Sequence, residues 1–431
     1  MTISGVKVAM SLPGFAVAGV LLMPAEPARA QGQFIQCIDP GQPLLRIPEL
    51  VSQNGKLRGS ILLSAEADRM NLGKTGSQCV PQYVRTFRGL NATLPGYQGT
   101  IPAGFPGAVP PAPASQYPDP MPGPTLRARV GDLVQLTFLN QIDTGLFGDS
   151  IDRAERGLGC DESSAPYPAI DKFPDCFHGS STGNIHFHGT HTNPGTTGDN
   201  IFIEVRPSLR VKGKPVVTPA SVQKNFDQFF RTCEQVLGKD VLSQWPRTWN
   251  DLPKAWVDEQ IALLKKYDSD PANREKLLPT DLRQRAEGAW PQYYIGAYPY
   301  CFRLPAYTEA SWPPAAPMVP SSHVGHAGLH MQKPPERPLV MGQAPGTHWY
   351  HAHKHGSTTI NVSNGMTGAF IIEGKYDDDL NAYYGANWTR TQPIIEINQL
   401  GVSPNLFTGT RGALPLQVNG RPQPTVSMQS G

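Results

Sequence analysis

The sequence predicts a mainly β protein, a β-sandwich of short strands with one helical insertion. Glycine (43) and proline (44) are abundant while charged residues make up only 17% of the chain. Such a composition suits short strands joined by many turns. Apolar and polar residues alternate in several short segments, which is typical of strands with one buried face. Residues 220–290 break this pattern with apolar residues at helical spacing.

Residues 1–30 have the features of a secretory signal peptide. Lys7 precedes an almost entirely apolar run at residues 8–23, and Ala-Arg-Ala at residues 28–30 gives a small-x-small cleavage pattern. The apolar run is shorter than the ~20 residues of a comfortable membrane span, although an uncleaved N-terminal anchor is the alternative. We therefore expect a secreted or periplasmic protein that has no membrane attachment once the signal is removed.

Charge and cysteine content limit the partners and the redox compartment. Basic residues (37) nearly balance acidic ones (35), the net charge is +2, and no basic run occurs. Binding to nucleic acid or to an acidic membrane therefore has no electrostatic support. An even number of cysteines in an exported chain indicates structural disulfides, although the pairing cannot be chosen from sequence. The six are Cys37, Cys79, Cys160, Cys176, Cys233 and Cys301.

The order of elements begins with a Pro/Gly-rich N-terminal extension at residues 31–115. Its composition predicts extended coil with little core of its own. Regular structure is expected from residues 125–140, where apolar residues alternate on both sides of Gly131-Asp132. This pattern predicts a β-hairpin with one buried face.

Further strands and a second hairpin follow along the chain. Asn419-Gly420 is a strong type I′ turn signal, so a hairpin is expected at residues 416–426. Short alternating segments predict strands at residues 184–188, 201–205, 347–353, 368–373 and 393–398.

A helical insertion is expected at about residues 207–290. Its apolar residues recur at helical spacing, and Asp and Thr stand where helices would begin. The recurring residues include Phe226, Phe229, Phe230, Ala255, Ile261 and Leu264. Capping a functional site, binding a partner and stabilising the chain all remain open as roles for the insertion.

Two segments carry histidines at strand spacing, residues 183–200 and 346–374. Side chains alternate along a strand, so the two histidines of each His-x-His share a face and lie ~6.6 Å apart at a rise of ~3.3 Å per residue. Two such strands side by side would bring four imidazoles around one small volume. Imidazoles without interleaved carboxylate or thiolate favour copper, zinc or iron. A single His-x-His is commonly an ordinary surface or core pair, so the prediction depends on both pairs and their flanks.

Four blocks, in order, carry a resemblance to the multicopper oxidase family. MPGPTLRARVGDLVQLTFLN resembles the family's opening strands, IHFHG its first copper motif, GTHWYHAHKHG its second, and GMTGAFIIEG the strand that follows. The match covers about residues 125–205 and 340–431. The resemblance implies a cupredoxin-like Greek-key β-sandwich at residues 116–375, followed by the truncated start of a second cupredoxin domain at residues 376–431.

The resemblance also implies copper as cofactor and a role for each motif residue. His186 would bind a type 2 copper, His188 and His351 one type 3 copper, and His353 the other. The family couples one-electron oxidation of a small reducing substrate to the reduction of dioxygen to water; the substrate is not evident from this chain. Asp199 resembles an acidic residue that assists proton delivery, a role that suits a carboxylate, or it is an ordinary turn residue.

Other histidines border the two motifs. We expect His191, His348 and His355 to pack beside the site or support its ligands rather than to bind copper. A looser group in a Pro-rich loop is either a solvated loop or an accessory copper site. That group is His323, His326 and His330 with Met331.

The chain departs from the family pattern at its C-terminal end. No histidine follows His355 and no cysteine follows Cys301, whereas the family takes four more histidines and its type 1 copper site from a C-terminal domain. Half of a trinuclear cluster is therefore expected here. A fragment of a full oxidase, assembly with a second chain, and a non-catalytic secreted copper-binding protein remain open. Copper-zinc superoxide dismutase also uses His-x-His but lacks the Trp-Tyr-His-x-His context.

Overall fold

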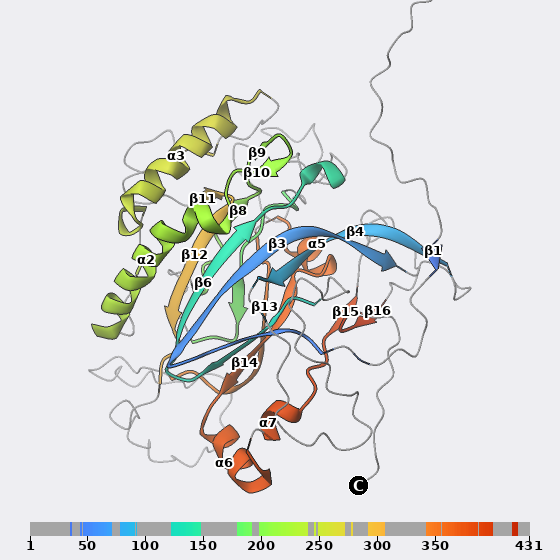
Figure 1. Ribbon diagram of the computed structural model, residues 1–431, viewed down its shortest axis with the longest axis vertical. Helices are drawn as coiled ribbons and strands as arrows, with labels where there is room; N and C mark the ends of the chain where they lie inside the picture. Colours follow the sequence, from blue (N-terminus) through green and yellow to red (C-terminus); the bar gives the residue numbers. More distant parts are fainter. Residues whose placement is uncertain are drawn as a thin grey trace, which may run out of the picture.

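The described part of the molecule is built around two five-stranded sheets (Figure 1). The β3 sheet has the order β1-β4-β3-β6-β12, and the β13 sheet has the order β2-β5-β14-β13-β7. The predicted class, a mainly β sandwich with a helical insertion, is confirmed. The computed structural model describes residues 35–36, 44, 46–70, 78–90, 92, 122–147, 179–191, 198–239, 245–246, 249–271, 277–278, 292–306, 342–354, 356–386, 388–399 and 416–420.

The bounds of the strands follow the two sheets. The β3 sheet consists of β1 (Ile35–Gln36), β4 (Gln78–Gly89), β3 (Lys56–Met70), β6 (Leu133–Asn140) and β12 (Ala297–Arg303). The β13 sheet consists of β2 (Glu49–Val51), β5 (Thr125–Arg129), β14 (Thr367–Glu373), β13 (Gly346–His351) and β7 (His186–His188). Three strand pairs lie outside these sheets: β8 (Ile203–Arg206) with β11 (Gln292–Ile295), β9 (Arg210–Val211) with β10 (Lys214–Pro215), and β15 (Ile397–Gln399) with β16 (Leu416–Val418).

Aromatic side chains join the two sheets across one core. The ring of Phe187 in β7 lies 4.7 Å from that of Phe302 in β12, and Tyr350 in β13 lies 5.7 Å from Phe87 in β4. All four are at most 3% exposed. Each aromatic ring buried in this way contributes a large apolar area, so these contacts fix the positions of β7 and β13.

The predicted hairpin at residues 125–140 is wrong, because its two strands lie in different sheets. β5 pairs in parallel with β2 and β14, whereas β6 pairs with β3 and β12. The chain crosses the sandwich at Gly131, which has a φ of +95°, a conformation that glycine adopts without strain. The alternation of apolar and polar residues indicates which side chains are buried but not which strands pair. Two strands that face each other across a core therefore give the same pattern as the two strands of a hairpin.

The expectation of coil over residues 31–115 is wrong for β2, β3 and β4. β3 and β4 pair along most of their length, and β3 also pairs with β6. Leu57, Ile61 and Leu63 are fully buried and hold β3 against the core. The division into domains at residues 115 and 375 stays a prediction, although these strands belong to the same sheets as the predicted cupredoxin domain.

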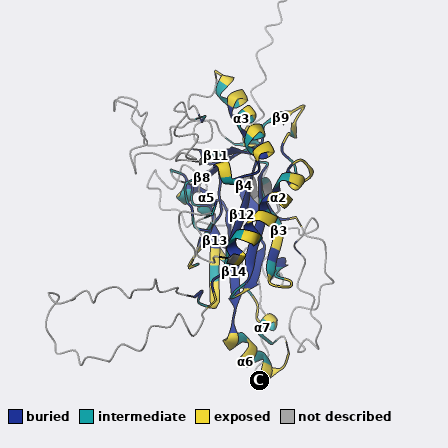
Figure 2. Ribbon diagram, turned by 90° about the vertical axis from the view of Figure 1, so that its left-hand side faces the viewer, coloured by how far each residue is buried: buried dark blue, intermediate teal, exposed yellow. Residues whose placement is uncertain are grey.

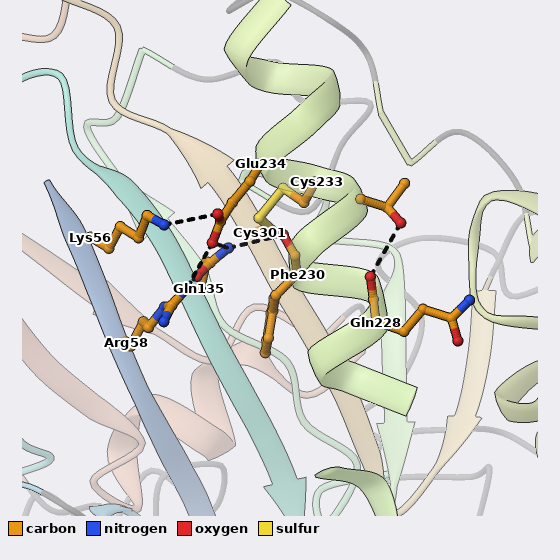
Figure 3. Close-up of a disulfide and its surroundings, with 9 residues drawn as sticks. Lys56, Arg58, Gln135, Gln228, Phe230, Cys233, Glu234 and Cys301 are labelled. Carbon is orange, nitrogen blue, oxygen red and sulfur yellow. Dashed lines mark hydrogen bonds and ion pairs between the residues drawn. A yellow bond between two sulfur atoms is a disulfide. The ribbon is translucent and has the colours of Figure 1, made fainter. Parts of the chain in front are cut away.

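The expected helical insertion contains α2 (Pro219–Lys239) and α3 (Lys254–Ser269). Helix α2 contacts β6 and β12, and Figure 2 shows both helices with exposed residues along their outer sides. Cys233 in α2 forms a disulfide with Cys301 in β12, which confirms a structural role for this pair (Figure 3). Glu234 lies beside it and pairs with Lys56 at 2.8 Å and Arg58 at 2.6 Å.

The remaining expected strands are present with shifted bounds, and all but β14 (Thr367–Glu373) are shorter than expected. β13 ends at His351 rather than residue 353, and β15 begins at Ile397 rather than residue 393. Asn419 and Gly420 have φ values of 49° and 81°, as a type I′ turn requires, while the expected return strand from residue 421 lies outside the described residues. Residues 1–30 and the loop of His323 also lie outside them.

Short helices follow β13 and β14. They are α5 (Thr358–Ser363), α6 (Lys375–Tyr384) and α7 (Trp388–Thr391). Within the described ranges, no helix has the length and apolar character needed to cross a membrane.

Candidate metal centre

The two histidine motifs lie side by side at the edge of the β13 sheet. β7 pairs antiparallel with β13, so that His186 is opposite His351 and Trp349 is opposite His188. Directly opposed residues share a face of a sheet. Phe187 and Tyr350 alternate with these residues and point into the core, which leaves the imidazoles on the outer face.

Three other imidazoles gather around that of His186. Its ring centroid lies 5.5 Å from that of His188, 5.1 Å from that of His351 and 5.0 Å from that of His353. One nitrogen from each of His186, His188 and His351 lies within 4.8 Å of the others, a group that could hold a metal ion. The structure therefore brings together all four histidines of the two motifs.

His351 has the hydrogen bonding of a metal ligand. Its Nδ1 lies 2.9 Å from the carbonyl oxygen of Ala352, which assigns the ring proton to Nδ1. Its Nε2 is buried and has no hydrogen-bond partner among the residues that the structure describes. A buried acceptor left unpaired costs free energy, and a metal ion at Nε2 would remove that cost.

Burial keeps the inner imidazoles uncharged. The pKa of His351 is lowered to about 3, mainly by burial and in smaller part by repulsion from the neighbouring histidines. The pKa of His353 is lowered as well, mainly by burial. Neutral imidazoles have a lone pair available for a metal, so both side chains are ready to bind one near neutral pH.

Asp199 contacts His186 at the cluster. Its Oδ1 lies 2.6 Å from His186 Nδ1, and the carboxylate is 28% exposed. A carboxylate at one ring nitrogen favours a proton there and directs the other nitrogen to a metal. From the sequence, Asp199 is either a proton relay or an ordinary turn residue. In the structure its contact with Nδ1 also orients the ring of His186.

Trp349 covers the cluster on its solvent side. Its indole stacks on His351 with centroids 4.0 Å apart and an interplanar angle of 20°, and it lies 5.3 Å from His188. It remains 39% exposed. Trp349 lies beside both histidines because the β7–β13 register places it opposite His188. This register cannot be predicted from the sequence alone.

His191 and His348 lie beside the cluster and contact backbone carbonyls. His191 Nδ1 is 2.7 Å from the oxygen of Gly342, and His348 Nε2 is 3.1 Å from that of Ala344. The buried Gln343 also accepts a hydrogen bond from the His191 backbone N–H at 2.7 Å. His355 lies outside the described residues.

Comparison with known proteins gives distant structural likenesses only. No family model and no curated protein matches the chain. A laccase from Pediococcus acidilactici aligns over 91% of this chain with a TM-score of 0.35 and 10% identity. McoA from the hyperthermophile Aquifex aeolicus aligns over 89% with a TM-score of 0.32 and 13% identity, and a metallo-oxidase from Campylobacter jejuni over 91% with 0.31 and 11%.

These solved structures are multicopper oxidases. The chain spans less than half of their length, 44%, 42% and 43% respectively. TM-scores this low carry no argument about function. A function can therefore be inferred only from the histidine cluster.

Proposed function

We propose that this chain is a copper-binding protein of multicopper oxidase type, which couples oxidation of a small reducing substrate to reduction of dioxygen. The observation that carries the proposal is the buried Nε2 of His351, which has no hydrogen-bond partner in the described ranges and belongs to a cluster of three imidazoles whose nitrogens lie within 4.8 Å of one another. His186, His188, His351 and His353 would hold copper. The motif order IHFHG and GTHWYHAHKHG supports copper over other metals.

The donor set is also one that suits copper on chemical grounds. Imidazole binds both copper oxidation states, whereas calcium, magnesium and manganese prefer oxygen ligands. The family resemblance extends this to a type 2 ion at His186, a type 3 ion at His188 and His351, and a second type 3 ion at His353. Copper, when bound, would supply one-electron chemistry toward dioxygen.

The protein's own groups would prepare the cluster for that chemistry. Asp199, partly exposed, contacts the Nδ1 side of His186; we propose that it holds His186 in one tautomer and exchanges protons with solvent. His188 is exposed and Trp349 is 39% exposed, so the cluster faces outward. We propose that a second chain or a further segment completes the copper coordination on this face, in a secreted or periplasmic setting.

Copper titration of the purified chain tests the proposal. One equivalent of copper(II) should quench the fluorescence of Trp349, since the indole stacks on a ligand. His351→Ala should weaken copper binding on the order of 100-fold, whereas Asp143→Asn, a control at the residue that caps residues 144–146, should not. Equal binding by wild type and His351→Ala would exclude the site.

A further inference from the structure

One buried amide connects three segments of the metal centre. Asn184 is fully buried and lies two residues before His186. Its Oδ1 accepts the backbone N–H of His353 at 2.6 Å, across 169 residues of sequence. Its Nδ2 donates to the carbonyl oxygen of Ile201 at 3.0 Å, two residues after Asp199.

The hydrogen bond between Asn184 and His353 takes the place of a strand-to-strand hydrogen bond. Strand pairing between β13 and β14 ends at His351, and the backbone N–H of Ala352 still bonds to Met366 at 3.0 Å. The next N–H, that of His353, has the Asn184 side chain as its acceptor. The backbone carrying this histidine is thus fixed by a side chain rather than by a neighbouring strand.

The bonds of Asn184 match the chemistry of a carboxamide. One acceptor and one donor on the same carbon reach two backbone groups at once. Aspartate keeps the acceptor but directs a second oxygen at the Ile201 carbonyl, and glutamine is longer by one methylene. A short, buried amide therefore sets the distance between three backbone segments with little freedom.

We infer that Asn184 is a positioning residue that sets the His186–His353 separation and the approach of Asp199 for copper binding. This inference rests on the proposed function. The two rings lie 5.0 Å apart, and residues that support metal ligands in this way affect affinity by about 10- to 100-fold. Without the amide, His353 loses its fixed place while His186, His188 and His351 remain held by strand pairing.

A second buried asparagine provides a matched control. Asn140, also fully buried, donates to the carbonyls of Ser181 at 2.7 Å and Val205 at 2.8 Å and accepts from the N–H of Ile142 at 3.2 Å. It has the same chemistry as Asn184, but none of these bonds involves a histidine or Asp199. Both Asn→Ala variants should lose similar stability, so the control separates a general loss of stability from an effect on the metal centre.

The experiment measures copper(II) affinity by chelator competition and the nitrogen hyperfine pattern by EPR in each variant. Asn184→Ala should bind copper about 10- to 100-fold more weakly, with one fewer imidazole nitrogen, while Asn140→Ala keeps the wild-type spectrum and affinity. Asn184→Asp, which retains the acceptor for His353, should keep the nitrogen count and bind more weakly than wild type.

Each outcome separates the two claims. A wild-type chain that does not bind copper would overturn the proposed function and this inference with it. Copper binding by wild type, with equal losses in Asn184→Ala and Asn140→Ala, would overturn the positioning role alone. If Asn184→Ala does not fold, a wild-type spectrum and affinity in Asn184→Asp would overturn it as well.

Discussion

The two faces of the β7–β13 pair differ sharply although alternate residues of the same two strands form them. The core face presents Phe187 and Tyr350, both fully buried, in contact with rings of the opposite sheet. The outer face presents His186, His188 and His351, and the buried Nε2 of His351 has no hydrogen-bond partner in the part of the chain that the structure describes. Packing on the first face holds the strands rigid, and the unmet bonding on the second leaves a place for a metal.

We expect the greatest loss of stability from a substitution that removes a side chain from the core face. Phe187→Ala should reduce the free energy of unfolding by about 3–5 kcal/mol, because it removes a fully buried ring. Denaturant unfolding of the metal-free protein measures this. By contrast, His351→Ala should leave that free energy nearly unchanged or raise it, since it removes a buried unpaired acceptor; a large loss of stability in His351→Ala would contradict the division between the faces.

A second prediction concerns a buried carboxyl on the outer face. Thr367 lies opposite His351 in the β13–β14 register and donates to Glu396 at 2.5 Å. Burial raises the pKa of Glu396 from 4.5 to about 7. Between these values the folded state binds more protons than the unfolded state, so stability should fall as pH rises from about 4.5 to 7, by on the order of 3 kcal/mol.

Urea unfolding across this pH range, in wild type and Glu396→Gln, tests that prediction. The glutamine variant cannot ionise, so its stability should lack this decrease. An equally steep decrease in Glu396→Gln would show that another group is responsible.

A smaller effect is expected from Asp199. Asp199→Asn removes the charge beside His186 Nδ1 and should weaken copper binding about tenfold. Isothermal titration with copper(II) measures the change, and Asp143→Asn, on the partly exposed side chain that caps residues 144–146, is the control. Unchanged affinity in Asp199→Asn would mean that the contact does not orient a ligand.

The smallest effect is expected where the core face meets a polar group. Tyr350→Phe removes only the hydroxyl that donates to the carbonyl of Pro124 at 2.6 Å. It should lower stability by about 1 kcal/mol, with copper affinity unchanged. A change in affinity would show that this bond, and not ring packing alone, holds β13 in place.

Sequence reasoning reached the histidine cluster because a strand period of two fixes which side chains share a face. The sequence does not indicate which strands pair, so residues 125–140 were expected to form a hairpin. Residues 31–115 were expected to be coil because their many prolines outweighed the alternation of apolar residues in β3. The role of Asn184 depends on contacts with His353 and Ile201. No local pattern records contacts between residues so far apart in the chain.

X-ray absorption at the copper edge of the copper(II)-loaded chain shows directly whether the β7 and β13 histidines bind copper. We predict three or four imidazole nitrogens around copper in the wild-type chain and one fewer in His351→Ala. A spectrum with a single imidazole, with sulfur ligands, or with no difference between the two proteins would contradict a metal centre built from the β7 and β13 histidines.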